Sequence, residues 1–196
     1  FHSIHEAVEK ARKDQNSTTI YLREGKYVLD KPLMLTSDDG NDSKELIIKN
    51  YPGEKTVLSS GIVLDLKWEK YKNGIMRAVV KGSPVMDMLF VNGELKSMAR
   101  YPNYDEKAVR FNGTSALATA PERVKKWKCP EGGYLHAMHK HDWGDFHYRI
   151  TGKNEKGELQ LEGGWQNNRP MGIHNENRMV ENIFEELDAP GERYYD

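Results

Sequence analysis

The amino-terminal hydrophobic pattern has the period of an amphipathic helix. The preceding residues "SIHE" form a capping-box pattern, in which the Ser3 hydroxyl accepts from the Glu6 amide and Glu6 reaches back to the Ser3 amide. Charged side chains fill the positions between the apolar ones, so one face is expected to be buried and the other solvated. The pattern predicts a helix that ends near Asp14. Its apolar face consists of Ile4, Ala7, Val8 and Ala11.

From Thr18 to about Leu66 the pattern changes to that of short strands. Runs rich in Ile, Val and Leu are separated by Gly, Pro, Asp and Asn, and no segment is long enough for a crossover helix. Such runs fit either an antiparallel meander or the first coils of a parallel β-solenoid. A helix ahead of the strands favours the solenoid, because the open end of a solenoid must be capped. The runs are "TIYL", "YVL", "PLML", "LIIKN" and "TVLSS".

Beyond Leu66 the turn signals are those of β-hairpins. Two Asn-Gly pairs each lie between strand-like runs, and a third pair of runs encloses a longer loop that closes with glycine. Three hairpins in succession predict an antiparallel sheet or small sandwich over residues 67–180. "APERVKKW" predicts a short helix with Pro121 in its first turn. The three turns lie at Asn73-Gly74, Asn92-Gly93 and Gly157.

Three segments together resemble a known family. They are "IHEAVEKAR" with the strands that follow it, the hairpin "MLFVNGELKSMARYPN", and "NRMVENIFEELDAPGERYYD". Over nearly its whole length the chain resembles the front end of secreted bacterial right-handed parallel β-helix proteins of the pectate-lyase-like superfamily. Within that superfamily it is most similar to the glycoside hydrolases of family 141. One departure is Arg193, which stands where the family usually has a tryptophan.

The resemblance implies a mainly all-β fold in three parts. Residues 1–66 would form a cap helix and the first coils of a right-handed parallel β-helix, residues 67–180 an inserted antiparallel β-domain, and residues 181–196 the re-entry into the β-helix. It implies a secreted, periplasmic or cell-surface protein, monomeric and without a cofactor, that takes a polysaccharide or oligosaccharide. Hydrolysis would use paired carboxylates on coils that follow residue 196. A polysaccharide lyase of the same fold and a non-catalytic glycan-binding protein are the alternatives.

The composition and charge limit the kinds of partner that the chain is expected to bind. The formal net charge is −1 and the charges of both signs are interspersed, which gives no field that would attract nucleic acid or an anionic membrane. No apolar run approaches the roughly 20 residues that span a bilayer. The lone Cys129 excludes an internal disulfide framework and a CxxC zinc site. Because the chain begins at Phe1 rather than at a methionine, we expect it to be a processed or trimmed piece.

The stretch "HAMHKHDWGDFH" holds four of the seven histidines. His139 and His141 are two residues apart and would share one face of a strand, within reach of one ion if His136, Asp142 or His147 also contributed. The helical zinc pattern with its general base is absent, so no metal is predicted, and these residues are expected to be structural or to line a substrate cleft.

The same stretch contains a possible sugar contact, Asp142-Trp143-Gly144-Asp145. A sugar offers an apolar ring face for an aromatic side chain and hydroxyl groups for a carboxylate or imidazole. The alternative is a core tryptophan flanked by turn aspartates. Downstream, the polar loop "GGWQNNRPMGIHNENR" is either the rim of a glycan cleft or a connection held by its own hydrogen bonds. The predicted substrate-binding residues are His141, Asp142, Trp143, Trp165, Arg169 and His174.

A group of carboxylates near the carboxyl terminus is the remaining candidate for catalysis. If "RMVENIFEEL" is helical, some of these side chains share one face. The pattern predicts a short amphipathic helix with a solvated acidic face rather than a catalytic pair, so no catalytic residue is expected in this segment. The carboxylates are Glu181, Glu185, Glu186 and Asp188.

Overall fold

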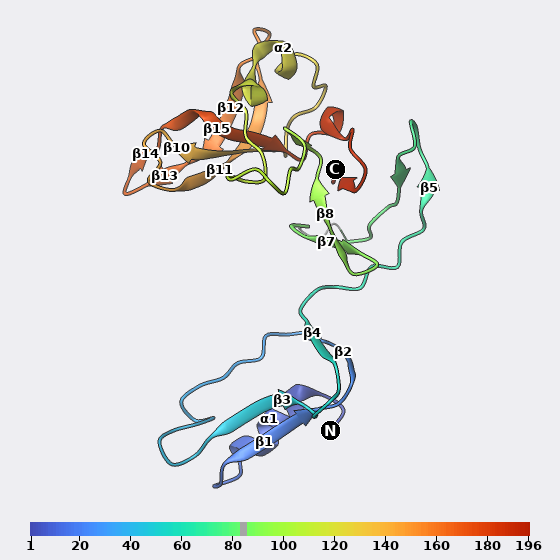
Figure 1. The fold of residues 1–196 in the computed structure, drawn as a ribbon, viewed down its shortest axis with the longest axis vertical. Coiled ribbons are helices and arrows are strands. Elements are labelled where there is room, and N and C mark those ends of the chain that lie inside the picture. Colours follow the sequence, from blue (N-terminus) through green and yellow to red (C-terminus); the bar gives the residue numbers. More distant parts are fainter. Residues whose placement is uncertain (83–85) are drawn as a thin grey trace. The chain divides into compact units, whose positions relative to one another are not determined.

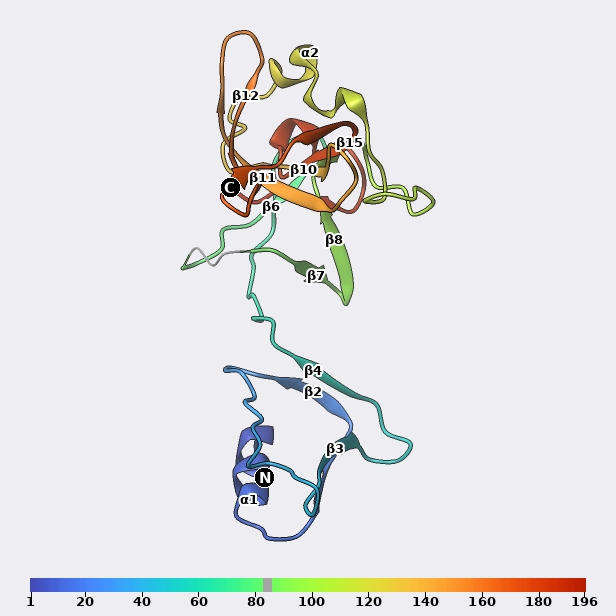
Figure 2. The same cartoon turned by 90° about the vertical axis from the view of Figure 1, so that its left-hand side faces the viewer.

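The computed structural model describes residues 1–82 and 86–196, which are mainly β-structure. The chain forms two compact units, Phe1–Pro84 and Val85–Asp196 (Figures 1 and 2). The partition inferred from the resemblance, with boundaries at residues 66 and 180, stays a prediction. None of the described helices is long and apolar enough to cross a bilayer.

The first unit begins with helix α1 (Ile4–Arg12), whose predicted apolar face is buried. The Ser3 hydroxyl accepts from the Glu6 amide at 3.1 Å, as expected. The reciprocal bond differs, because the Glu6 carboxylate accepts from the His2 amide at 3.1 Å rather than from the Ser3 amide. The Ser3 hydroxyl thus pairs one amide of the first turn, and the Glu6 carboxylate pairs the amide of the residue before the cap.

The first four strands pair in parallel, each with the strand two places away in the chain. Strand β1 (Thr18–Leu22) pairs with β3 (Leu46–Asn50), and β2 (Gly25–Val28) pairs with β4 (Thr56–Ser59). This pairing excludes the antiparallel meander for these strands. The run "PLML" was wrongly predicted as a strand, since the Met34 carbonyl accepts from the Arg12 guanidinium at 2.6 Å instead of joining a ladder.

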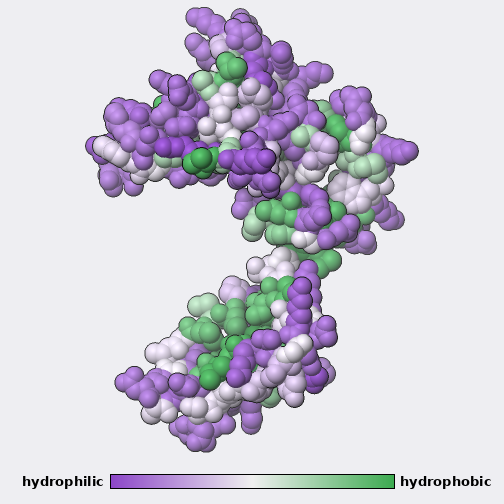
Figure 3. All heavy atoms as spheres, viewed as in Figure 1, coloured by the Kyte–Doolittle hydropathy of each residue, from purple (hydrophilic) through white to green (hydrophobic). Residues whose placement is uncertain are grey.

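A small core joins the helix to these strands. Ile4 and Val8 pack with Leu22, and half-buried apolar side chains surround them. Other apolar side chains, among them Ile47, Val57 and Leu58, are exposed, and Figure 3 shows apolar surface over this unit. The unit also contains the first predicted hairpin, β5 (Glu69–Lys70) with β6 (Met76–Arg77).

The second unit is built on a five-stranded antiparallel sheet in the order β12-β11-β10-β15-β9. One face of this sheet packs on the short helix η1 (Ala116–Thr119), on α2 (Pro121–Val124), predicted from its proline, and on Trp127. The strands are β9 (Arg100–Tyr101), β10 (Tyr134–His139), β11 (Asp145–Lys153), β12 (Leu159–Gly163) and β15 (Ile173–Glu181).

A three-stranded sheet completes the second unit. Strand β7 (Leu89–Val91) forms the predicted Asn-Gly hairpin with β8 (Glu94–Met98), and β16 (Glu192–Arg193) pairs with β8 in parallel. Arg193 is buried there, and its guanidinium donates to the carbonyl groups of Lys96 and Asp87. Backbone carbonyls thus accept from Nε and Nη2 of this guanidinium, while Nη1 is buried without a hydrogen-bond partner. The family that the chain resembles usually has a tryptophan at this position.

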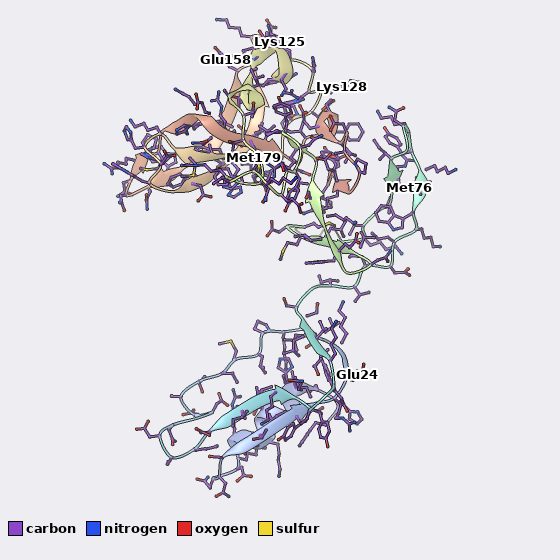
Figure 4. The ribbon with its side chains drawn as sticks, in the orientation of Figure 1. Glu24, Met76, Lys125, Lys128, Glu158 and Met179 are labelled. Atoms are coloured by element: carbon purple, nitrogen blue, oxygen red, sulfur yellow. The ribbon has the colours of Figure 1, made fainter. Side chains whose placement is uncertain are left out.

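The helix predicted over "RMVENIFEEL" does not form. Residues up to Glu181 belong to β15, Asn182 has a left-handed backbone (φ 55°), and a single 3₁₀ turn, η2 (Phe184–Glu186), follows. Met179, labelled in Figure 4, and Val180 are both buried on β15, so neighbouring residues are covered on opposite faces of the sheet. The expectation of a solvated acidic face is also wrong, because Glu186 is buried.

Candidate functional site

A tight turn after strand β10 exposes Trp143. The His139 amide donates to the Gly144 carbonyl and the Asp142 amide to the His139 carbonyl, both at 2.8 Å. Asp142 has a left-handed backbone, with φ of 58°, which aspartate tolerates better than most residues. Trp143 is 75% exposed, so the interpretation of this residue as a core tryptophan is wrong. Here the Trp143 corner denotes His139 to Trp143, with Arg110, Arg169 and His174.

The imidazole ring of His139 packs against the exposed indole of Trp143. The two rings are stacked, with centroids 5.0 Å apart and an interplanar angle of 14°. His139 Nδ1 accepts from the His141 amide at 3.2 Å, so in the neutral ring the proton lies on Nε2. Burial, and then the positive charges of His141, Lys140 and Arg169, lower the pKa of His139. A neutral imidazole therefore underlies Trp143 near neutral pH.

The Asp142 carboxylate is held by two basic side chains from distant parts of the chain. Arg110 Nη1 donates to Asp142 Oδ1 at 2.7 Å, and His174 Nε2 lies 3.9 Å from the same oxygen. His174 Nδ1 accepts from the amides of Glu176 and Asn177, which places the ring proton on Nε2, toward Asp142. The charge of Asp142 is therefore largely compensated within the protein.

Trp165 and Arg169 lie on a small hairpin of strands β13 (Trp165–Gln166) and β14 (Arg169–Pro170). Gly164 permits the approach of this hairpin to the sheet, since a Cβ atom there would lie 1.9 Å from the Tyr148 ring. Trp165 is 65% exposed. Three residues after Arg169, the Gly172 carbonyl accepts from the Lys140 amide at 2.8 Å, so β14 leads into the segment beside the Trp143 corner.

Contacts thus join four of the six predicted substrate-binding residues, while Trp165 and Arg169 lie on the β13–β14 hairpin. The four are His141, Asp142, Trp143 and His174. Sequence reasoning missed Arg110, which contacts Asp142 across 32 positions of the chain and has no local pattern that marks it.

A second cluster occupies the sheet face opposite the core. His136 is stacked between Phe111 and His147, with centroid distances of 3.9 Å and 3.8 Å. His136 Nε2 lies 2.5 Å from Asp145 Oδ2, and His147 Nε2 lies 3.6 Å from Glu181 Oε1. Burial lowers the pKa of His136 in spite of Asp145, whereas Glu181 raises the pKa of His147.

The histidines do not converge as a metal site would require. Strand β10 ends at His139, so His141 lies in the turn and not on the same strand face, contrary to the expectation from its spacing. Within residues 1–82 and 86–196, no three His, Cys, Asp or Glu side chains form a group that could hold a metal ion.

Comparison of this chain with protein-family models, with curated proteins and with solved structures finds no match.

Proposed function

We propose that this chain is the glycan-binding part of a carbohydrate-active enzyme, and that the enzyme is a glycoside hydrolase acting on complex polysaccharide of the plant cell-wall type. The observation that carries the proposal is Trp143, an exposed indole fixed flat against the His139 ring. An exposed tryptophan held by its neighbours offers a rigid apolar surface, which costs little conformational entropy on binding. Its flat face matches the apolar face of a pyranose ring.

Polar groups around the indole suit the hydroxyl groups of a sugar. The ring centroids of His141 and Trp143 lie 5.5 Å apart. Arg110 and His174 both contact Asp142 through Oδ1, which leaves Oδ2 available. An imidazole and a carboxylate oxygen can hydrogen-bond to hydroxyls beside the stacked ring. Trp143 would thus supply the stacking contact, and His141 and Asp142 the orienting contacts, that a sugar subsite needs.

The architecture we propose for the first unit is the capped start of a right-handed parallel β-helix. Two observations support it: the parallel pairs β1–β3 and β2–β4, and the packing of α1 residues Ile4 and Val8 on the apolar side chains of these strands. A parallel crossover of this kind is right-handed in nearly all proteins. Hydrolysis would use a carboxylate pair outside these residues, in a secreted, monomeric protein.

Binding of soluble cell-wall oligosaccharides, measured by calorimetry, tests the proposal. Trp143→Ala is expected to weaken binding about tenfold, equivalent to about 1.4 kcal/mol, through loss of the stacking surface. Trp68→Ala, which removes a half-exposed tryptophan in the first unit, is the matched control. Equal affinity of the Trp143→Ala and unaltered chains, or no binding to any oligosaccharide, would overturn the assignment of this surface.

The reaction class needs a separate measurement on the full-length enzyme. New reducing ends without absorbance from an unsaturated uronate would support a hydrolase. The appearance of that absorbance would instead identify a lyase, and binding without any product would identify a non-catalytic glycan-binding protein.

A further inference from the structure

Residues 102–113, here the Phe111 loop, are held on the second unit by two different kinds of contact. At the two ends of the loop, the buried Arg100 guanidinium donates to three backbone carbonyl groups. Near its end, the Phe111 ring stacks on His136, with centroids 3.9 Å apart and an interplanar angle of 26°. Arginine keeps its proton in proteins, so of these two contacts only the stack can respond to pH. The three carbonyls are those of Pro102 at 2.8 Å, Phe111 at 2.8 Å and Gly113 at 2.7 Å.

The backbone of this loop is strained where it reaches His136. Phe111 has φ of 49° and Asn112 has φ of 53°, so two consecutive residues with side chains are left-handed. This conformation is unusual for a bulky residue, and it persists only where surrounding contacts offset its free-energy cost. The contacts of Phe111 with Arg100 and His136 supply that offset. Loss of the stack would therefore favour a different conformation of the loop.

The His136 ring is enclosed on both faces. Phe111 covers one face and His147 the other, with the two imidazole centroids 3.8 Å apart. His136 Nε2 lies 2.5 Å from Asp145 Oδ2. The charged groups that act on His136 are Asp145 and His147 on β11 and Glu181 on β15; beyond them, Arg100 acts on Glu181 and Asp87 acts on His147.

A proton on His136 is unfavourable in this enclosed position. Burial removes water from the imidazolium, and His147, whose pKa Glu181 raises, places a like charge against its face. Asp145 offsets these effects only in part, so the pKa of His136 is lowered. Departure of Phe111 would hydrate the ring and let it turn away from His147. The open loop therefore binds this proton more tightly than the closed loop does, and by linkage acid favours the open loop.

We propose that the stack of Phe111 on His136 is a pH-sensitive latch, which is closed while His136 is neutral and opens when His136 takes up a proton. Opening would free the part of the loop that lies between its Arg100-bound ends. Arg110, which precedes Phe111 and donates to Asp142 at 2.7 Å in the closed loop, would then withdraw. The inference does not depend on glycan binding, because every contact in it lies within the chain.

Nuclear magnetic resonance of the unaltered chain between pH 7.5 and pH 5.5 tests the latch. The ring-proton shifts of Phe111 report the stack directly, and they should move toward those of an unstructured peptide in acid. The Asp105 amide, which donates to the Asn112 carbonyl at 2.8 Å, reports the loop by hydrogen exchange. Its protection, relative to an unstructured peptide at the same pH, should fall about fivefold, since one proton allows at most about tenfold per pH unit. The Ala118 amide, which donates to the Ser115 carbonyl outside the loop, should keep its protection.

Three variants locate the titrating group. His136→Phe keeps an aromatic ring between Phe111 and His147 but cannot take up a proton, so protection of the Asp105 amide should no longer depend on pH. Phe111→Ala removes the stack and should give low protection at both pH values. His2→Gln, which removes an exposed histidine of the first unit, is the matched control and should keep the full response.

Three results would overturn the latch. An equal fall of protection in His136→Phe would place the titrating group elsewhere in the chain. Protection that rises in acid would show that an imidazolium binds the Phe111 ring more tightly than the neutral ring does. Protection in Phe111→Ala equal to that of the unaltered chain would show that this ring does not close the loop. The oligosaccharide measurements test the proposed function separately.

Discussion

Removal of the Glu186 carboxylate tests whether a buried polar contact stabilises the second unit. Glu186 lies in the η2 turn and is 4% exposed. Its Oε1 accepts from Trp127 Nε1 at 2.7 Å, and the two oxygens accept from Arg123 Nη1 at 3.0 Å and 2.8 Å. Trp127 is part of the core and Arg123 belongs to α2, so this carboxylate fastens η2 to the helix that covers the sheet.

The expected loss for Glu186→Ala is about 3 kcal/mol. An unpaired buried N–H costs roughly 1–3 kcal/mol, which applies to the Trp127 indole. Removal of one partner from a buried ion pair costs roughly 3–5 kcal/mol. The Arg123 side chain is 28% exposed, so water can solvate part of its charge, and the lower end of that range applies. Glu186→Gln keeps an acceptor for Trp127 and should cost about 1 kcal/mol.

Urea unfolding followed by circular dichroism and by tryptophan fluorescence measures these differences. Glu155→Ala is the matched control, since Glu155 is exposed and its side chain has no hydrogen bond or ion pair with any residue that the structure describes. This variant should stay within about 0.5 kcal/mol of the unaltered chain. The reasoning would be refuted if Glu186→Ala were as stable as Glu155→Ala, or if the alanine and glutamine variants lost the same stability.

Three further predictions concern pH and local structure. Glu181 raises the pKa of His147, so this residue adds to the free energy of unfolding below its unfolded pKa, and the gain is lost as pH rises through the folded pKa. Burial lowers the pKa of His136, so protonation of this residue destabilises the fold as pH falls. His147→Gln should therefore lose more stability than the unaltered chain between pH 8 and pH 5, and unfolding profiles with the same slope would contradict this. Gly93→Ala should cost about 1 kcal/mol in urea unfolding, because Gly93 has φ of 84°, and no loss would argue against that turn. Ser3→Ala should cost about 1 kcal/mol through loss of the helix cap, measured as reduced stability of α1 by amide hydrogen exchange; unchanged protection would exclude the cap.

Local sequence patterns correctly predicted those elements that a few neighbouring residues determine. The cap at Ser3 and the Asn92-Gly93 turn depend on backbone geometry that neighbouring residues determine, and both are present. The "RMVENIFEEL" prediction failed because a helical stripe and a strand covered on both faces can share the same apolar residues. Pairing with β10 decides between them, and β10 lies more than 30 residues earlier in the chain.

Local sequence patterns also did not indicate which charged side chains are buried. Glu186 was expected on a solvated face, and Arg193 stands where the resembling family usually has a tryptophan. Both side chains are buried and hydrogen-bonded to partners more than 50 residues away. Trp143 was left open between an exposed sugar contact and a core position, because it lies among Asp and Gly residues that favour a turn. That context predicts an exposed tryptophan at least as well as a buried one, and the fold resolves the choice.

The sign of the charge at the Trp143 corner shows why composition could not select a ligand. From the sequence, Asp142 was a candidate acceptor for sugar hydroxyls, and a net charge of −1 gave no reason to expect an anionic partner. In the fold, Arg110 donates to one oxygen of that carboxylate, while the side chains of Lys140 and Arg169 have no hydrogen-bond or ion-pair partner among the described residues. Local potential depends on which charges are paired, and pairing depends on tertiary contacts that no single segment contains. A nearly neutral chain can therefore carry unpaired cations at one turn, which its composition does not reveal.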